Sequence, residues 1–488
     1  MGADGFYSAE QVRELERRAI RAGMSARILM QRAAAAAWRE LTRTWPVAAS
    51  IAVVCGPGNN GGDGYDLARL ARAAGRQVEV WEIGVTKSRP AAAARRDWLA
   101  DGGRVHRWRQ GALAGASVIV DALFGIGLSR PPQGAALAAV QAINQARLDG
   151  AGVLALDIPS GLDANCGVVL GVAVRADCTV TFIASKPGLS TASGPDHAGR
   201  IVLAPLDISA RVFRGLKAEI VVLEPRLLKA LLPPRSRASH KGHHGHVLIV
   251  GGDQGMGGAA LLAARGALRA GAGLVSVATH PSHAAAMMAA QPELMVHALD
   301  NGRDLRPLLS RASVVAIGPG LGLSAWARGL WPQCMAHELP IVLDADGLNW
   351  LADDPQRRSD WVLTPHPGEA ARLLKCTASQ VQGDRFAALR ALVDRFGGVA
   401  VLKGAGTLVG GAEIALCARG SPGMAVGGMG DVLAGVIAAL MAQGLGSEPA
   451  ARVGVLAHAL AGEMAARHRE RGTLPGDLLD CLRTVLNP

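Results

Sequence analysis

Short apolar runs recur along the whole chain, separated by glycine-rich turns and by stretches with helical periodicity. Each run predicts a buried strand, at 50–55, 77–83, 117–121, 152–157, 178–182, 246–250, 274–279, 314–317, 341–344, 361–364 and 399–403. Continuous apolar runs of this length that alternate with helices are typical of parallel sheets covered on both faces. Right-handed crossovers normally join such strands. The pattern therefore predicts an α/β protein.

The segments between the strands carry helix and turn signals. Ser8 followed by Gln11 is a capping-box signature, and the segment to about Trp45 reads as two helices broken near Gly23. The glycine-rich segment 56–64 is predicted to be a turn and 66–74 a helix. A second turn, at 251–258, precedes a long helix that extends to Arg269.

Chain length and a change in composition predict two domains. With 488 residues, of which half are hydrophobic, the chain is too long for one ordinary core. A polar, basic region at 211–246 interrupts the alternation of strands and helices, and the boundary is placed at its start, near 215–224. The expected domains are 1–215 and 222–488. No fixed-period repeat is visible, which excludes a solenoid.

Composition also excludes several classes of protein. The N-terminus carries acidic residues before any apolar run, unlike a signal peptide, and the longest apolar stretch, Val432–Leu445, is too short for a membrane span. Seven scattered cysteines without a CxxC motif indicate neither disulfides nor a zinc site, so a cytoplasmic, reduced protein is expected. The net charge is +11, but the Lys and Arg residues are not interleaved with aromatic residues as on a nucleic-acid-binding surface. The positive charge is therefore expected to attract anionic cofactors.

The first glycine-rich segment combines phosphate-type glycines with polar side chains. Cys55–Gly64 reads CGPGNNGGDG and follows a predicted strand, the context in which such loops bind anions. Asn59, Asn60 and Asp63 add oxygen ligands for a cation or polar substrate. Asp121 and Asp157 end two further strands, and strand ends of a parallel sheet converge. The alternative is an Asn/Gly-rich turn without a ligand.

These motifs carry a family resemblance. GPGNNGGDG, DALFGIG, DIPSGLD and FIASKPG, in this order, resemble the YjeF N-terminal family of NAD(P)H-hydrate epimerase domains. The resemblance implies a Rossmann-like, three-layer domain with a potassium ion held by Asn60, Asp121 and Ser160. It implies Asp157 as the general base, and Lys186 is a lesser candidate for a phosphate contact. The substrate-binding set that it implies is Asn59, Asn60, Gly61, Gly62, Asp63, Gly125, Ile126, Gly127, Leu128, Ser129, Arg130, Pro131 and Asp157.

The second half contains a similar combination of glycines and an acid. In Ser421–Gly435, SPGMAVGGMGDVLAG, Gly427, Gly428 and Gly430 precede Asp431 at the start of an apolar helix. Unpaired N–H groups and the partial positive charge of a helix N-terminus favour a bound phosphate. An N-capping Asp after a loop is the structural alternative. A separate cluster of histidines, at 240, 243, 244 and 246 in the basic region, lacks Cys or Asp partners and is interpreted as structural or phosphate-facing.

Five more loops, GGDQGMGGA, GPGLG, LDADGLN, TPHPGEAARL and VLKGAGT, each follow a predicted strand. Together they resemble the YjeF C-terminal family, the ADP- or ATP-dependent NAD(P)H-hydrate dehydratases, which have a ribokinase-like fold. By that resemblance the hydrate is phosphorylated at its C6 hydroxyl while Asp431 takes the proton. The implied hydrate-binding residues are Ala259, Gly318, Gly320, His366 and Asp431. The implied nucleotide-binding residues are Lys403, Gly404, Ala405, Gly406, Thr407 and Gly430.

The leading hypothesis is a bifunctional metabolite repair enzyme. It would interconvert R and S hydrates of NADH and NADPH (NADHX and NADPHX) and dehydrate the S form at the expense of ADP, or ATP, with Mg²⁺. Family analogy also favours a homo-oligomer without nucleic-acid or membrane partners. Two alternatives compete: a ribokinase-like small-molecule kinase with a regulatory N-terminal domain, and a first domain that binds without catalysis.

The chain departs from the family pattern in both halves. Leu29–Ala34 lacks an expected acidic residue followed by Ala-Gly, and Ala370 stands where Met is usual. Val426 and Met429 replace threonines beside the second glycine turn, and each lost hydroxyl removes a hydrogen bond worth about 0.5–1.5 kcal/mol. Nucleotide preference or affinity is the property that these changes put in question.

Overall fold

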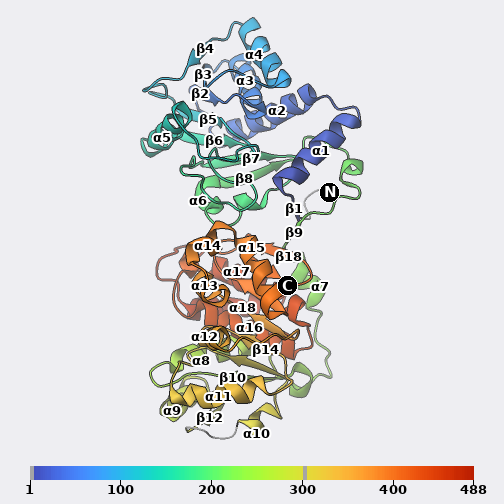
Figure 1. Cartoon of the computed structure of the whole chain (residues 1–488), viewed down its shortest axis with the longest axis vertical. Helices are drawn as coiled ribbons and strands as arrows, with labels where there is room; N and C mark the ends of the chain where they lie inside the picture. Colours follow the sequence, from blue (N-terminus) through green and yellow to red (C-terminus); the bar gives the residue numbers. More distant parts are fainter. Residues whose placement is uncertain (1–4, 301–304) are drawn as a thin grey trace. The chain divides into compact units, whose positions relative to one another are not determined.

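The computed structural model describes residues 5–300 and 305–488, so the first residues of the expected N-terminal domain, 1–4, lie outside the described part. The chain divides into two compact units, Met1–Val221 and Val222–Pro488. Figure 1 shows the two units and labels many of their helices and strands. The α/β architecture predicted from the sequence is confirmed in both.

The first unit is built on a parallel sheet of seven strands in the order β4-β3-β2-β5-β6-β7-β8. Its strands are β2 (Ser50–Cys55), β3 (Gln77–Glu82), β4 (Val105–Arg107), β5 (Val118–Ala122), β6 (Gly152–Leu156), β7 (Cys178–Phe182) and β8 (Arg200–Ala204). A short antiparallel pair joins β1 (Gly5–Phe6) to β9 (Ile220–Val222) through Gly5 opposite Val221. Strand order runs outward in both directions from β2 and β5, as in a Rossmann-like sheet.

Alternate residues of the strands face two separate cores. Ile51 and Val53 belong to the core shared with α1 to α4, whereas Ala52 and Val54 face the core shared with α5. The sheet is therefore the middle of three layers. The helices are α1 (Ala9–Arg21), α2 (Ala26–Thr44), α3 (Asn59–Ala73), α4 (Arg89–Ala100), α5 (Ala135–Leu148) and α6 (Gly194–Ala198), with 3-10 turns η1 (Pro187–Leu189) and η2 (Ala210–Phe213).

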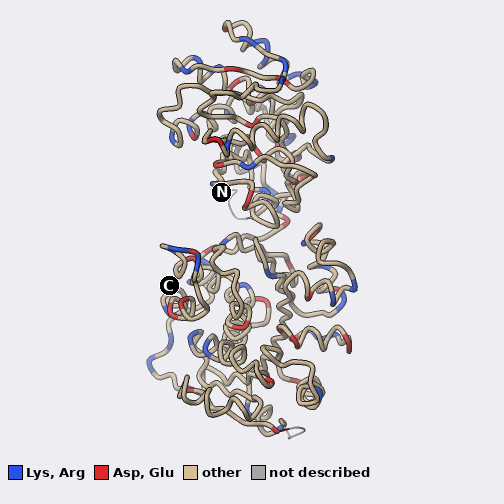
Figure 2. The backbone as a smooth tube through the Cα atoms, turned by 90° about the vertical axis from the view of Figure 1, so that its left-hand side faces the viewer, with Lys and Arg blue, Asp and Glu red and all other residues tan. Residues whose placement is uncertain are grey.

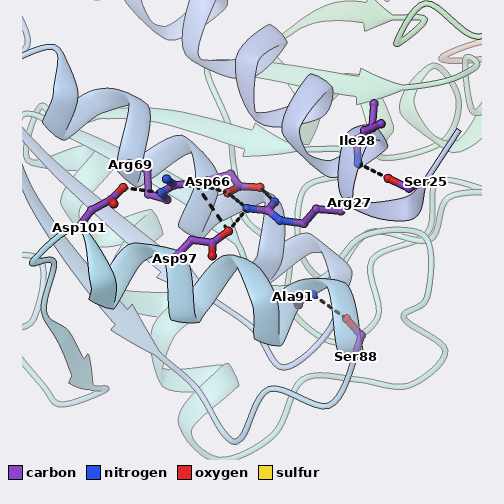
Figure 3. A network of polar contacts seen from close by, with 9 residues as sticks. All are labelled: Ser25, Arg27, Ile28, Asp66, Arg69, Ser88, Ala91, Asp97 and Asp101. Atoms are coloured by element: carbon purple, nitrogen blue, oxygen red, sulfur yellow. Dashed lines mark hydrogen bonds and ion pairs between the residues drawn. The ribbon is translucent and has the colours of Figure 1, made fainter.

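A network of charges fixes α3 against its neighbours α2 and α4 (Figure 3). Arg27 on α2 forms ion pairs with Asp66 on α3 and with Asp97 on α4. Arg69 on α3 donates to Asp101, the residue that ends α4, at 2.7 Å. Asp66 is 4% exposed, so the Arg27–Asp66 pair is largely shielded from water. This pair helps to hold α3, whose first turn carries Asn59–Asp63.

The second unit contains a larger, mixed sheet with the strand order β18-β17-β16-β15-β14-β13-β10-β11-β12. The strands from β10 to β16 pair in parallel, and β17 and β18 add an antiparallel hairpin to β16. They are β10 (His246–Val250), β11 (Leu274–Thr279), β12 (Met295–Ala298), β13 (Val314–Ile317), β14 (Ile341–Leu343), β15 (Trp361–Leu363), β16 (Val399–Leu402), β17 (Thr407–Gly410) and β18 (Ile414–Cys417).

Helices of the second unit pack on this sheet and on one another. The glycine turn at 427–430 leads into α16, an almost wholly buried helix that packs against α8, α17 and the strands β10, β13 and β14. The helices are α7 (Arg226–Leu231), α8 (Gly257–Arg269), α9 (Pro281–Ala290), α10 (Arg306–Leu309), α11 (Ala325–Met335), α12 (Asp346–Asp353), α13 (Pro367–Leu374), α14 (Ala378–Gly383), α15 (Arg385–Phe396), α16 (Met429–Ala442), α17 (Ser447–Ala465) and α18 (Pro475–Val485), with 3-10 turns η3 (Lys241–His244) and η4 (Pro422–Met424).

Every strand predicted from the sequence is confirmed to within one residue at each end. The capping box at Ser8 and Gln11 is also confirmed, and α1 and α2 flank the break at Gly23. The turn predicted at 56–64 is wrong beyond Gly58, because α3 begins at Asn59. Gly61 lets α3 approach the sheet, since a side chain there would meet the Gly56 carbonyl at 2.0 Å. Tertiary packing thus overrides the low helix propensity of Asn and Gly.

Figure 2 shows Lys and Arg interspersed with Asp and Glu in both units. Among the described residues, no helix combines the length and apolarity that a membrane crossing requires.

Candidate active sites

A cavity of about 720 Å³ opens in the first unit where the loops after β2 and β5 diverge. In a parallel sheet this is the point at which strand order reverses, and it is where ligands of such folds bind. The predicted residues that line the cavity are Asn59, Asn60, Asp63, Gly125, Ile126, Gly127, Leu128, Ser129, Arg130 and Asp157. Met30, from the segment that departs from the family pattern, lines it as well.

Three predicted substrate-binding residues lie outside this lining. Gly61 packs against the Gly56 carbonyl, Gly62 lies against the Met30 side chain, and Pro131 lies beside Gly171. The two glycines support the wall of the cavity and do not face it.

Asp157 lies at the turn after β6 in a left-handed backbone conformation, with φ of 66°. Asp tolerates this conformation better than most residues because its short side chain can bond locally. Here Asp157 Oδ1 accepts from Lys186 Nζ at 2.5 Å and from the Phe182 N–H at 3.2 Å. Asp157 Oδ2 lies 3.4 Å from the Ile126 N–H, on the cavity side.

Lys186 does not occupy the place of a phosphate contact. Its side chain is fully buried, and Nζ donates to Asp157 Oδ1, to Thr181 Oγ1 at 2.9 Å and to the Phe182 carbonyl at 2.6 Å. These bonds use all three ammonium protons. Burial lowers the pKa of Lys186, and the charge of Asp157 opposes that shift. Lys186 therefore serves as the fixed partner of Asp157.

Asn60, Asp121 and Ser160, the predicted cation ligands, meet around the loop 124–125. Ser160 Oγ donates to Asp121 Oδ1 at 2.7 Å and accepts from the Phe124 N–H at 2.9 Å. Asn60 is 7% exposed, and neither atom of its amide has a hydrogen-bond partner among the described residues. Burial raises the pKa of Asp121 to about 6, against the lowering effect of the Ser160 hydrogen bonds.

Two more carboxyl groups face the same cavity. Asp63 was predicted as a substrate contact, but Glu16 on α1 was not recognised as a site residue. Burial and then the charge of Asp157 raise the pKa of Glu16, and the same causes raise that of Asp63. Glu16 has no ion-pair or hydrogen-bond partner in the described part of the chain. Only its partly buried position on an amphipathic helix could have indicated it.

In the second unit Asp431 occupies the first turn of α16, immediately after the left-handed Gly428. Burial raises the pKa of Asp431 to about 7, and the next largest contribution is the negative charge of Asp344. A carboxyl with this pKa exchanges its proton readily near neutral pH, which suits a general base.

Lys403 lies among these acids. Its Nζ donates to Asp344 Oδ1 at 2.6 Å and lies 3.8 Å from Glu369 Oε2. Burial lowers the pKa of Lys403, but the charges of Asp344 and Glu369 outweigh it and the net shift is upward. Thr364 Oγ1 also donates to Asp344 Oδ1, at 2.8 Å. Three strand ends, those of β14, β15 and β16, thus contribute to one cluster.

His366 caps α13 beside this cluster. Its ring Nδ1 accepts from the Gly368 N–H at 2.9 Å, and its backbone N–H donates to Glu369 Oε2 at 2.7 Å. The side chain is 56% exposed, and its Nε2 lies 3.5 Å from Glu369 Oε1. Burial raises the pKa of Glu369.

The remaining predicted residues surround the cluster on two sides. Gly430 lies against Lys403, since a side chain there would meet Lys403 Nζ at 3.1 Å. Gly318 follows β13 and packs on the Asp344 carbonyl, while Gly320 lies beside Met256 and Ala259. Gly404 and Ala405 are exposed, Thr407 is half-buried and Gly406 is buried.

Asp344 and Glu369 are members of this site that sequence reasoning did not assign. Both stand inside motifs that the sequence singled out, LDADGLN and PHPGE, so the signal was present. Their carboxylates lie close to Lys403 because neighbouring strands pack side by side. The spacing of residues within each motif does not contain this information.

The chain matches known families over most of its length. Residues 26–188 match the model of the YjeF-related protein N-terminus, and 247–484 match that of NAD(P)H-hydrate dehydratase. A bifunctional NAD(P)H-hydrate repair enzyme of Coxiella burnetii is 47% identical over 99% of both chains. One from Escherichia coli is 43% identical, over 99% of this chain and 94% of that protein.

Two solved structures each match a little over half of the chain. A ribokinase-like superfamily protein of Enterococcus faecalis is 29% identical, with a TM-score of 0.51, and covers 55% of this chain and 95% of its own. A structure from Streptococcus mutans gives the same TM-score at 30% identity, covering 55% of this chain and 99% of its own. The expected ribokinase-like fold is confirmed.

The full-length matches favour the repair enzyme over the alternative of a small-molecule kinase with a regulatory domain. Both family models are present in one chain, in the order in which the two groups of motifs occur. The chain belongs to the family of bifunctional NAD(P)H-hydrate repair enzymes, which combine an epimerase with a dehydratase.

Proposed function

We propose that residues 1–215 carry the epimerase and residues 222–488 the dehydratase, each with its own site. The observation that supports this division best is the presence of one complete group of acid, cation and glycine turn in each unit. Asp157 with Lys186 forms the first group, and Asp431 with Lys403 the second.

In the epimerase, the cavity at the β2–β5 switch point holds the nicotinamide end of the hydrate. Asp157 acts as the general base, because Oδ2 faces the cavity while Oδ1 is fixed by Lys186. The loop from Gly125 to Arg130 and the first turn of α3 contact the rest of the substrate. A buried, positioned carboxylate of this kind contributes roughly 10²–10⁴-fold to proton transfer.

A potassium ion fits the group formed by Asn60, Asp121 and Ser160. The amide oxygen of Asn60 is buried without a partner, and hard cations take oxygen ligands. When bound, the ion supplies positive charge beside the substrate hydroxyl. Asn60, Asp121 and Ser160 would hold it, and Phe124 fixes Ser160 through its backbone N–H.

In the dehydratase, the phosphate chain of ADP, or ATP with Mg²⁺, lies against Lys403, Gly404, Ala405, Gly406, Thr407 and Gly430. Ala259, Gly318, Gly320, His366 and Asp431 contact the hydrate. Asp431 takes the proton of the C6 hydroxyl while the hydroxyl oxygen attacks the terminal phosphoryl group of the nucleotide. The phosphate then leaves with the C6–O electron pair, and loss of a ring proton from C5 restores the double bond. Positioning and charge neutralisation dominate such transfers.

Recovery of the near-ultraviolet dihydronicotinamide absorbance from mixed R and S NADH hydrate tests the proposal, with ADP, with ATP and without nucleotide. Full recovery that requires a nucleotide is expected, and the comparison of ADP with ATP gives the preference. Recovery that stops at the S fraction would contradict the epimerase assignment, and a stable phosphorylated product would contradict the dehydratase assignment.

Self-association of the chain and a cytoplasmic location stay predictions. Sedimentation of the purified protein measures the first directly.

A further inference from the structure

Arg385, the first residue of α15, is a fully buried cation without a neutralising acid. Its side chain is 0% exposed, and no carboxylate of the described residues lies within ion-pair distance. The guanidinium donates instead to four uncharged oxygens: Gln382 Oε1 at 2.8 Å, and the carbonyls of Leu402 at 3.1 Å and of Lys403 and Gly406 at 3.3 Å. A buried charge of this kind is costly, so its retention points to a role.

The three carbonyls belong to the loop that carries the proposed nucleotide site. Drawing the Lys403 carbonyl toward Arg385 turns the Gly404 N–H the opposite way, because the C=O and N–H of a trans peptide are antiparallel. Gly404 has φ of +129°, and a side chain there would lie 3.0 Å from the guanidinium. No acceptor among the described residues takes the Gly404 N–H. The loop thus offers a backbone donor on its exposed side.

The positive charge of Arg385 favours an anion at the same loop. Burial lowers the pKa of Arg385 to about 10, which leaves the guanidinium positive at neutral pH. In a buried environment this charge is weakly screened, and it lies directly behind the loop. An anion on the exposed face of the loop is the counter-charge that the protein itself does not supply.

We propose that Arg385 is a positioning residue of the dehydratase, which fixes the loop Lys403–Thr407 for the nucleotide phosphates and attracts their negative charge from behind. The inference rests on the proposed nucleotide site. It assigns a role to a residue that does not touch the nucleotide.

Arg358 provides a matched control. It too binds backbone carbonyls, of His337 at 2.9 Å and Leu339 at 3.0 Å, but it is neutralised by Asp360 at 2.8 Å. It precedes β15, at the end of the strand opposite to Thr364 and His366. Loss of Arg358 therefore removes similar bonds away from the proposed site.

The experiment compares Arg385→Gln, Arg385→Lys and Arg358→Gln in the full chain. Nucleotide KM, hydrate KM and kcat are measured on pure S NADH hydrate, and the shift in melting temperature on adding ADP is measured without hydrate. We expect Arg385→Gln to raise the nucleotide KM about 10- to 100-fold and to abolish the ADP shift, with hydrate KM unchanged. Arg385→Lys keeps the positive charge but loses the planar set of guanidinium donors, so we expect the nucleotide KM to rise by about 3- to 10-fold.

Arg358→Gln should lower the melting temperature and leave the nucleotide KM at the wild-type value. If Arg385→Gln retains the wild-type nucleotide KM, the inference is overturned; if that variant does not fold, a folded Arg385→Lys with the wild-type KM overturns it. Dehydration by the wild type without any nucleotide would overturn the proposed function and this inference with it.

Discussion

The two proposed sites use the same elements in opposite electrostatic surroundings. Each places an aspartate beside a glycine-rich turn and near a lysine, which is fully buried in the first unit and partly buried in the second. In the first unit Lys186 is bonded to Asp157 itself. In the second, Lys403 is bonded to a third residue, Asp344, and Asp431 is left among acids.

The comparison indicates that the electrostatic environment of the proposed catalytic aspartate depends on which acid the lysine bonds, and not only on the presence of a lysine. Asp157 is held in a buried ion pair with Lys186. Asp431 instead has a pKa raised to about 7 by burial and by neighbouring acids, with Lys403 only partly compensating. A glycine turn next to an Asp and a Lys therefore does not by itself specify the protonation state.

The largest expected effect comes from removing the acid of the second site. Asp431→Ala should reduce nucleotide-dependent dehydration by about 10²–10⁴-fold, because it removes the proposed proton acceptor. Epimerisation by the same chain should continue at the wild-type rate. Both rates are measured on separated R and S hydrates, with the exposed Asp480→Ala as control. Dehydration retained near the wild-type rate would refute the role.

Asp157→Asn breaks the first site and spares the second. We expect epimerisation to slow by roughly 10²-fold or more, since an amide does not accept the proton. Dehydration of pure S hydrate should be unaffected. A loss of both activities would contradict the assignment of one activity to each unit.

Breaking the ion pair itself tests the comparison through stability. Lys186→Met leaves Asp157 shielded and unpaired, which should cost roughly 3–5 kcal/mol of unfolding free energy. The double variant with Asp157→Asn should recover part of that loss, because both charges are then gone. Denaturant unfolding of the single and double variants measures the coupling, with the exposed Lys217→Met as reference. Additive losses would show that the two charges do not interact.

The pH dependence of the two activities gives the smallest effect. Asp431 accepts a proton only when ionised, so dehydration should fall about tenfold per pH unit below its pKa of about 7. The sign for stability is opposite. Between the ordinary Asp pKa near 4 and pH 7 the folded carboxyl retains a proton that the unfolded one has lost, so its contribution favours folding at low pH and disappears as pH rises.

Dehydration and melting temperature measured from pH 5 to 9 test both signs in one series. In Asp431→Asn the residual rate should not follow this titration. A wild-type dehydration rate that is flat between pH 5 and 7 would contradict the raised pKa.

The sequence was sufficient for the central strands and for the loops that follow them. Runs such as Val247–Val250 are apolar on both faces, a pattern that only a covered parallel strand satisfies. The strands that the sequence missed are the edge strands β4, β8 and β12, the hairpin of β17 and β18, and the short antiparallel pair of β1 and β9. Val105–Arg107 is short, polar and half-exposed, so it carries no hydrophobic signal.

The candidate site residues also fall into those that the sequence identified and those that it missed or misread. Motif residues such as Asn60, Asp157 and Asp431 were identifiable because they stand at strand ends or helix starts. Lys186, Arg385 and Glu16 could not be identified in this way, because their positions depend on burial or on contacts with other segments of the chain. Local spacing does not contain that information. Lys186 was recognised within its motif, yet its buried bond to Asp157 reverses the role expected of an exposed lysine.

The walls of the proposed epimerase cavity come from segments far apart in the first unit. Arg13 and Glu16 belong to the first helix, whereas Phe182 and Leu206 lie close to the end of the unit. During synthesis the chain leaves the ribosome from its N-terminus at about 5–20 residues per second. The cavity-facing side of α1 is therefore exposed for roughly ten seconds or more before the residues of the opposite wall are synthesised. Closure of the cavity is one of the last events in the biosynthesis of this unit, so a nascent chain that stops before Leu206 cannot form the complete epimerase site.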